Sequence, residues 1–136
     1  MFKVLDRFTD WRAISIGEER RFQDFPRHIR HSNLGQLAHN KVIKYLEKSE
    51  IAIIPSRWEE PFGRTSLEAA SRGCATIISG TGGLSETTDH AVKLKKLNAA
   101  NIETEVNKLI YNKDLRKEIQ TKSQKNIPTL LQETLP

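Results

Sequence analysis

Cysteine and long apolar runs are both scarce in this 136-residue chain, whose only cysteine is Cys74. No internal disulfide can form, and a reducing cytoplasm is the expected compartment. No stretch approaches the roughly 20 apolar residues that a membrane-spanning helix needs, and no signal-peptide pattern opens the chain. With 37% hydrophobic and 29% charged residues, the composition is that of a soluble globular protein of one domain at most.

Aromatic residues are also few, at 7%, and this bears on the net charge of +5. A modest positive charge favours phosphate-bearing ligands or an anionic membrane face. Nucleic-acid binding also calls for aromatic residues among the basic ones, and only Arg20, Arg21 and Phe22 hint at that pattern. A solvated basic surface is the simplest interpretation, so we do not expect nucleic acid as a partner.

Metal-binding patterns are missing as well. The four histidines have no zinc-ligand spacing, and no cysteine pair joins them. We expect no metal, and interpret the histidines as polar strand-end or surface residues: His28, His31, His39 and His90. Cys74 precedes an apolar strand and has little basic charge nearby, which predicts a packed, unreactive thiol.

Short apolar segments alternate with helical stretches, a pattern typical of a Rossmann-like parallel α/β sheet flanked by helices. The expected strands lie near Arg12–Ile16, His28–His31, Ile51–Pro55, Ala75–Ser79 and Ala91–Leu94. The expected helices lie near Ala38–Ser49, Arg64–Arg72, Asn98–Tyr111 and Asp114–Lys125. We assign residues 1–127 to this domain and residues 128–136 to a polar tail.

The most informative segment runs from Glu60 to Glu68. The apolar run Ile51–Ile54 ends at Pro55, and the helical composition around Leu67 indicates a strand, a loop and a helix N-terminus. Backbone N–H groups and the positive end of the helix dipole would form an anion site there. The residues that would donate these N–H groups are Phe62, Gly63, Arg64 and Thr65. N–H groups that bind a phosphate, next to two carboxylates that accept hydrogen bonds from hydroxyl groups, suit a nucleotide sugar.

The segment resembles the Glu-x7-Glu motif of the retaining glycosyltransferases of family four, which have the two-domain GT-B architecture. Four further stretches resemble family landmarks, in the family's order and spacing. They are Trp11–Gly17, the stretch from Leu34 to Leu46, Gly73–Ile78 and Gly82–Glu86. The likeness spans roughly residues 1–125 and identifies the chain as similar to the C-terminal, donor-binding domain of such an enzyme.

The resemblance implies a role for each matched residue. Glu60 would contact the donor sugar near its reacting face, and Glu68 would hold the ribose hydroxyls of the nucleotide. Backbone groups would bind the sugar and the diphosphate at Phe62, Gly63, Arg64 and Thr65. Gly82 and Gly83 would approach the donor from the next loop. The loop Asn33–Leu37, and Leu37 in particular, resembles the one that contacts the nucleobase.

The start of the chain departs from the family's pattern. Residues Phe2–Phe8 look like the end of a first helix, and the first strand, with its Gly-Arg loop and following Lys, has no counterpart. In the strand order 3-2-1-4-5-6 that strand would lie at the sheet centre. Its loss leaves unpaired backbone on two neighbours. We therefore expect either that the strands around residues 14 and 53 pair directly, or that a second chain fills the gap.

The resemblance implies the donor-binding portion of a retaining glycosyltransferase that moves a hexose from an NDP-sugar to a saccharide or lipid acceptor. The family's N-terminal domain and the cations of the first loop have no counterpart here. Because each such cation is worth on the order of 10²-fold in rate, we expect the isolated chain to be inactive. Polysaccharide biosynthesis in the cytoplasm, with the NDP-sugar as substrate and no cofactor, is the expected setting.

Other interpretations stay open. One is a non-catalytic nucleotide-binding or interaction module that keeps the fold. Another is a binder of phosphate-rich partners, attracted by the basic charge. Self-association into a homo-oligomer and peripheral contact with the inner membrane face are also open.

Overall fold

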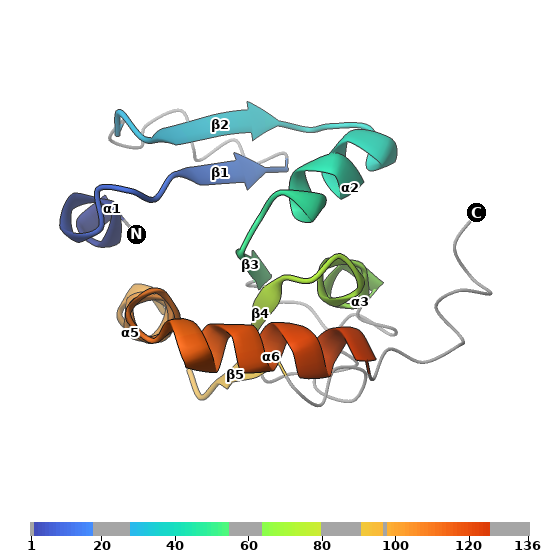
Figure 1. The fold of residues 1–136 in the computed structure, drawn as a ribbon. Coiled ribbons are helices and arrows are strands. Elements are labelled where there is room, and N and C mark those ends of the chain that lie inside the picture. The colour runs from blue at the N-terminus through green and yellow to red at the C-terminus, as the bar shows by residue number, and fades with distance from the viewer. Residues whose placement is uncertain (1, 18–27, 55–63, 80–90, 97, 126–136) are drawn as a thin grey trace.

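The computed structural model describes residues 2–17, 28–54, 64–79, 91–96 and 98–125. Its elements follow one another as strands and helices along the chain (Figure 1). The strands are β1 (Ala13–Ile16), β2 (His31–Gly35), β3 (Ile51–Ile54), β4 (Ala75–Ser79) and β5 (Val92–Leu94). The helices are α1 (Phe2–Arg7), α2 (His39–Glu47), α3 (Arg64–Ser71), α5 (Ala99–Tyr111) and α6 (Lys113–Lys125).

The strands form two separate parallel sheets, one of β1 and β2 and one with the order β3-β4-β5. In the larger sheet, Ile77 of β4 lies between Ile53 of β3 and Val92 of β5. The predicted α/β class with parallel strands flanked by helices is confirmed. One strand was placed wrongly, because the second strand begins at His31 instead of ending there. The preceding residue, Arg30, still belongs to the turn that leads into β2.

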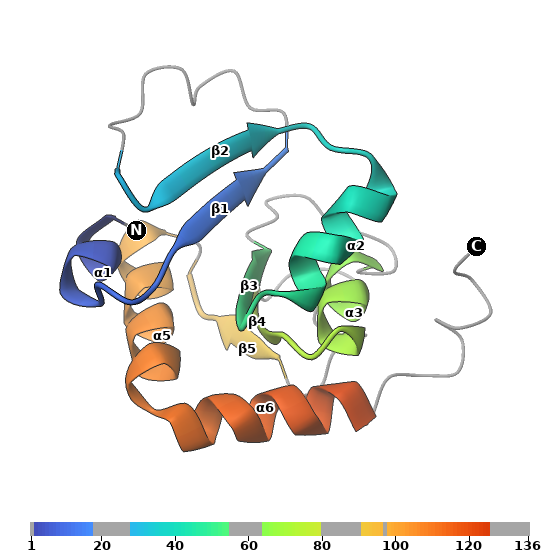
Figure 2. The same ribbon diagram turned by 45° about the horizontal axis from the view of Figure 1, so that its top comes forward.

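The expected direct pairing of the strands around residues 14 and 53 is wrong. Within the described ranges, β1 pairs only with β2, and β3 pairs only with β4. Figures 1 and 2 both show β1 as the strand of its sheet that lies on the side of β3. The other expectation, that a second chain fills the gap between them, stays a prediction.

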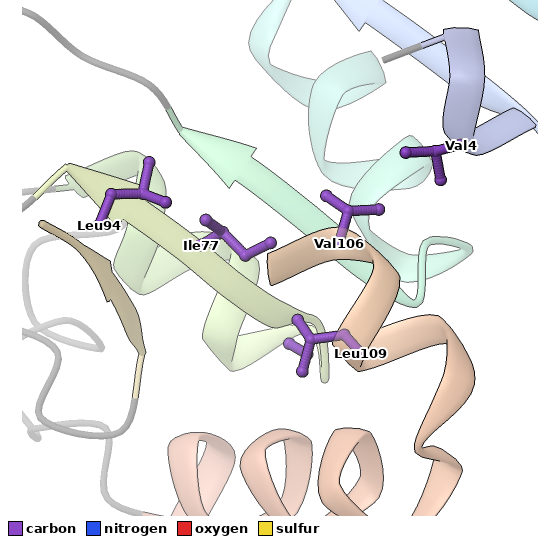
Figure 3. Close-up of a cluster of buried hydrophobic side chains, with 6 residues drawn as sticks. Val4, Ile77, Leu94, Val106 and Leu109 are labelled. Carbon is purple, nitrogen blue, oxygen red and sulfur yellow. The ribbon is translucent and has the colours of Figure 1, made fainter. Parts of the chain in front are cut away.

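Apolar side chains cover both faces of the larger sheet. On one face, side chains of α1 and α5 join those of β4 and β5 in one buried cluster (Figure 3). Its members are Val4, Ala75, Ile77, Leu94, Val106 and Leu109. A second cluster joins Ala52, Ala69 and Cys74. Successive strand residues point to opposite faces, so Ala52 places this second cluster on the face opposite to its neighbour Ile53.

The helices begin and pack as their sequences indicate. The Asn98 side chain accepts a hydrogen bond of 2.8 Å from the Asn101 N–H and so caps α5. Val106 and Leu109 form the buried apolar side of α5 and pack in the cluster on the sheet. Among the described residues, no helix has the length and apolar character needed to cross a membrane.

Candidate functional site

A backbone hydrogen bond between two glycines joins the carboxyl ends of β1 and β2. The Gly17 N–H donates a hydrogen bond of 2.8 Å to the Gly35 carbonyl. Gly35 has a φ of +66°, a conformation that side chains rarely adopt, so the chain can turn sharply after β2. The turn leads through Leu37, which is half-buried, into α2 at His39. Ligands of parallel α/β sheets bind beyond these carboxyl ends.

Glu68 is the one buried acidic residue in the part of the chain that the structure describes, with 4% of its surface exposed. It lies on the second turn of α3, and α2 packs beside this helix. One of its carboxylate oxygens lies 3.7 Å from Nε2 of His39, the first residue of α2. A carboxylate near the start of a helix, beyond the carboxyl ends of parallel strands, is placed where ligands of such sheets bind and can accept hydrogen bonds from hydroxyl groups.

The structure therefore brings together two segments that were predicted to bind the ligand and that are distant in sequence. Leu37 lies two residues before His39, and His39 contacts Glu68, so the loop after β2 and the first half of α3 meet at one place. Arg64 and Thr65 begin α3, as predicted. The remaining candidates lie outside the described residues: Glu60, Phe62, Gly63, Gly82 and Gly83.

The helices that carry His39 and Glu68 both begin close to these residues. α2 starts after Ala38, whose side chain cannot cap the first amides of the helix. α3 starts at Arg64, four residues before Glu68. N–H groups at helix starts attract anions, and a carboxylate can accept hydrogen bonds from hydroxyl groups. The arrangement can hold a ligand that carries phosphate and hydroxyl groups close together.

His39 is exposed, as expected for a surface histidine, but the sequence did not predict that it lies close to Glu68. Its side chain is half exposed, at 51%, and still reaches the buried carboxylate. The available signal was its position just after Leu37, at the start of a helix that follows a strand. Histidine at that point can both donate and accept hydrogen bonds.

Two other titratable side chains, Cys74 and His31, have shifted pKa values. Burial raises the pKa of the Cys74 thiol to about 11, and the nearby Glu50 adds to the effect. Its Sγ donates to the carbonyls of Leu46 and Ser49. The predicted packed thiol is confirmed. Burial, helped by His28, lowers the pKa of His31, whose Nε2 lies 2.7 Å from Oγ of Ser15.

Across the described ranges, no three His, Cys, Asp or Glu side chains come together as metal ligands would. The expectation that no metal is needed stays a prediction, because five of the candidate site residues lie outside those ranges.

The parallel strands and the helices that flank them define a Rossmann-like type of α/β domain. Comparison with known proteins makes this specific. The family model described as "Glycosyl transferases group 1" matches residues 3–126. The chain belongs to this family, as its sequence motifs predicted.

Curated relatives match over part of the chain. A glycogen synthase from Mycobacterium tuberculosis (strain CDC 1551 / Oshkosh) is 40% identical over 53 residues, which is 39% of this chain and 13% of the relative. An uncharacterized 42.6 kDa protein from the cps region of Klebsiella pneumoniae is 34% identical over 55 residues, or 40% of this chain and 15% of the relative. Each match thus spans less than a sixth of the relative's length.

Solved structures share the fold. The C-terminal domain of the glycosyl transferase group 1 family protein LpcC from Francisella tularensis has a TM-score of 0.77 at 23% identity, covering 90% of this chain and 71% of that one. Anabaena Alr3699/HepE in complex with UDP has a TM-score of 0.73 at 18% identity, covering 96% and 39%. Sucrose-phosphate synthase from Thermosynechococcus elongatus has a TM-score of 0.70 at 14% identity, covering 92% and 43%.

Proposed function

We propose that this chain is the donor-binding portion of a retaining glycosyltransferase that moves a hexose from an NDP-sugar to a saccharide or lipid acceptor. The observation that carries the proposal is the buried Glu68 on the second turn of α3, in contact with His39 at the start of α2. Family membership supports the reaction class. Solved complexes of the similar Alr3699/HepE with UDP, and with UDP-glucose, support a nucleotide-sugar donor.

In this proposal, Glu68 accepts hydrogen bonds from the ribose hydroxyls. A carboxylate offers two acceptor oxygens to two neighbouring hydroxyl donors, which an amide could not do without leaving an N–H group unsatisfied. The loop at Leu37 contacts the nucleobase. The amides that begin α3, at Arg64 and Thr65, bind the diphosphate together with Phe62 and Gly63.

The remaining roles concern the reacting sugar. Glu60 contacts the donor sugar near the bond that breaks, and Gly82 and Gly83 let backbone approach it closely. The diphosphate leaves as an anion, and cations are needed to stabilise it. The family's Gly-Arg loop and Lys have no counterpart in this sequence. We therefore propose that the chain binds the donor but does not transfer sugar without a partner domain that completes the site.

Calorimetric titration with UDP, GDP and ADP tests the binding role. We expect one of the three to bind, and Glu68→Gln to weaken it by about 10- to 100-fold, the worth of a hydrogen bond to a charged group. Glu118→Gln is a matched control, since Glu118 is an exposed helical carboxylate whose described partner is Lys122 at 2.7 Å. The control should bind as the unchanged chain does.

If Glu68→Gln is less stable, a double-mutant cycle separates the loss of a ribose contact from the loss of folded protein. For the unchanged chain, the 2′-deoxy form of the nucleotide should bind more weakly than the nucleotide itself. For Glu68→Gln, the two forms should bind with the same affinity. Equal losses in both proteins would show that Glu68 does not contact the ribose. Failure of all three nucleotides to bind would leave an interaction module as the better interpretation.

A further inference from the structure

The contact between His39 and Glu68 joins two groups of different hydrogen-bonding character at the candidate site. Nε2 of His39 lies 3.7 Å from one carboxylate oxygen of Glu68. An N–H···O hydrogen bond is about 2.7–3.2 Å long, so the two groups are adjacent without a direct hydrogen bond to each other. The Glu68 side chain is 5% exposed and that of His39 is 51% exposed. A ligand group that reaches this carboxylate oxygen therefore also meets the imidazole.

The packing of α2 beside α3 sets this distance. Leu46 of α2 packs against the cluster that contains Ala69 of α3 and Ala52 of β3, and Figure 2 shows the two helices side by side. His39 is the first residue of α2, and Glu68 lies on the second turn of α3. An apolar contact elsewhere along the two helices thus keeps the imidazole next to the carboxylate.

The two groups complement the two sides of a hydroxyl. A carboxylate oxygen only accepts hydrogen bonds and a neutral imidazole donates one through its N–H, whereas a hydroxyl donates one and also accepts. The negative charge of Glu68 favours the tautomer with its proton on the facing Nε2 of His39. A hydroxyl oxygen about 2.8 Å from the carboxylate oxygen and about 3.0 Å from Nε2 closes a triangle with the observed side of 3.7 Å. One hydroxyl can therefore bind to both groups at once.

We propose that His39 and Glu68 bind the same ribose hydroxyl of the nucleotide, which donates to Glu68 and accepts from Nε2 of His39. This inference rests on the proposed function, in which Glu68 binds the ribose. It adds His39 as a second binding residue and makes the site specific for a nucleotide that has this hydroxyl. A nucleotide without it leaves both protein groups unpaired, so the site rejects the deoxy analogue more strongly than an acceptor alone would.

Calorimetric titration of two His39 variants tests the proposal. The probe is whichever of UDP, GDP and ADP binds the unchanged chain, at pH 8, above the range in which histidines ordinarily become charged. His39→Ala removes the donor, and we expect it to weaken binding by about 3- to 10-fold, the worth of one neutral hydrogen bond. His39→Gln can keep an N–H donor near the position of Nε2 and should retain most of the affinity.

Asn40→Ala is the matched control, because Asn40 is the next residue of α2 and is exposed and uncharged. Neighbouring residues of a helix do not face the same side, so this variant should bind as the unchanged chain does. Equal losses in His39→Ala and Asn40→Ala would assign the effect to α2 as a whole and overturn the proposal.

The 2′-deoxy and 3′-deoxy forms of the same nucleotide separate a direct contact from an indirect one. The form that lacks the shared hydroxyl should bind His39→Ala and the unchanged chain equally, while the other form should still show the loss. If His39 only orients Glu68, its substitution should be coupled to both hydroxyls, and this result would overturn the direct contact. Coupling to neither hydroxyl would overturn it as well.

This proposal and the proposed function fail in different ways. Unchanged affinity of His39→Ala, together with a loss in Glu68→Gln, would overturn the role of His39 alone. Failure of all three nucleotides to bind would overturn both.

Discussion

The half of the molecule built on β3, β4 and β5 is buried far more completely than the half built on β1 and β2. All five residues of β4 are buried, whereas β1 and β2 contain only half-buried and exposed residues. Among the described residues, Val4 and Leu5 of α1 are the only buried apolar side chains that precede Ala52. The hydrophobic free energy of folding therefore comes mainly from the larger sheet.

A few specific contacts attach the first half to the second. The guanidinium of Arg116 in α6 lies over the Trp11 ring, 5.0 Å from its centre. The same side chain donates to the carbonyls of Leu109 and Ile110 at the end of α5. Within the first half, Arg30 donates to the Leu5 carbonyl of α1, and Val4 of the same helix packs in the cluster of the larger sheet. The difference between the halves teaches that individual polar and aromatic contacts hold the two-stranded sheet in place. The three-stranded sheet is stabilised mainly by its buried apolar core.

The largest expected effect comes from the core of the larger sheet. Ile77→Ala removes a side chain that has no exposed surface and should cost about 2–5 kcal/mol in the free energy of unfolding. Ile14→Ala, in the smaller sheet, should cost less than about 1 kcal/mol because Ile14 is already 40% exposed. Chemical denaturation of both variants measures the difference. Equal losses would break the comparison between the halves.

A smaller effect is expected from the aromatic tether. Trp11→Ala removes the contact with Arg116 and should cost about 1 kcal/mol. Amide exchange should become faster in β1 and β2 while β4 keeps its protection. Tyr111→Ala is the control, because Tyr111 is 81% exposed. A uniform loss of protection in both sheets would show that Trp11 supports the whole fold instead of joining its halves.

The last expected effect on stability is confined to alkaline pH and concerns the Cys74 thiol. Its pKa is raised from 9.0 to about 11, so above pH 9 the unfolded chain releases a proton that the folded chain keeps. Stability should be independent of this group below pH 9 and fall between pH 9 and 11. Denaturation at pH 8 and pH 10 measures the fall, and Cys74→Ala should make it smaller. An identical fall in the variant would assign it to other groups.

Most of the larger sheet could be predicted from the sequence, because its strands are continuous apolar runs. Ala75–Ser79 was predicted with its observed bounds, and β3 begins at Ile51 as expected. β2 was misplaced because its sequence, His-Ser-Asn-Leu-Gly, has no apolar alternation. Its register comes from pairing with β1, including the irregularity after Ser15, and tertiary pairing of this kind leaves little local signal.

The candidate site also contains one residue that the sequence pointed to and one that it did not. Glu68 stood out in the sequence because its spacing from Glu60 forms a motif; it is buried, and its binding role stays a prediction. His39 could not, because its proximity to Glu68 arises from the packing of α2 beside α3 and not from any short-range pattern. The separation of the sheet into two parts was also not predictable in detail. The sequence indicated a missing strand, and only the pairing shows that β1 and β3 do not close over its place.

The measurement that tests the central claim most directly is an NMR titration of the ¹⁵N-labelled chain with UDP-glucose, GDP-glucose and ADP-glucose. The account predicts that one of them shifts the resonances of Leu37, His39 and Glu68 together, and that Glu68→Gln removes these shifts. It also predicts unchanged resonances in the middle of α6. Shifts confined to α6, or no shift with any of the three sugars, would contradict the account.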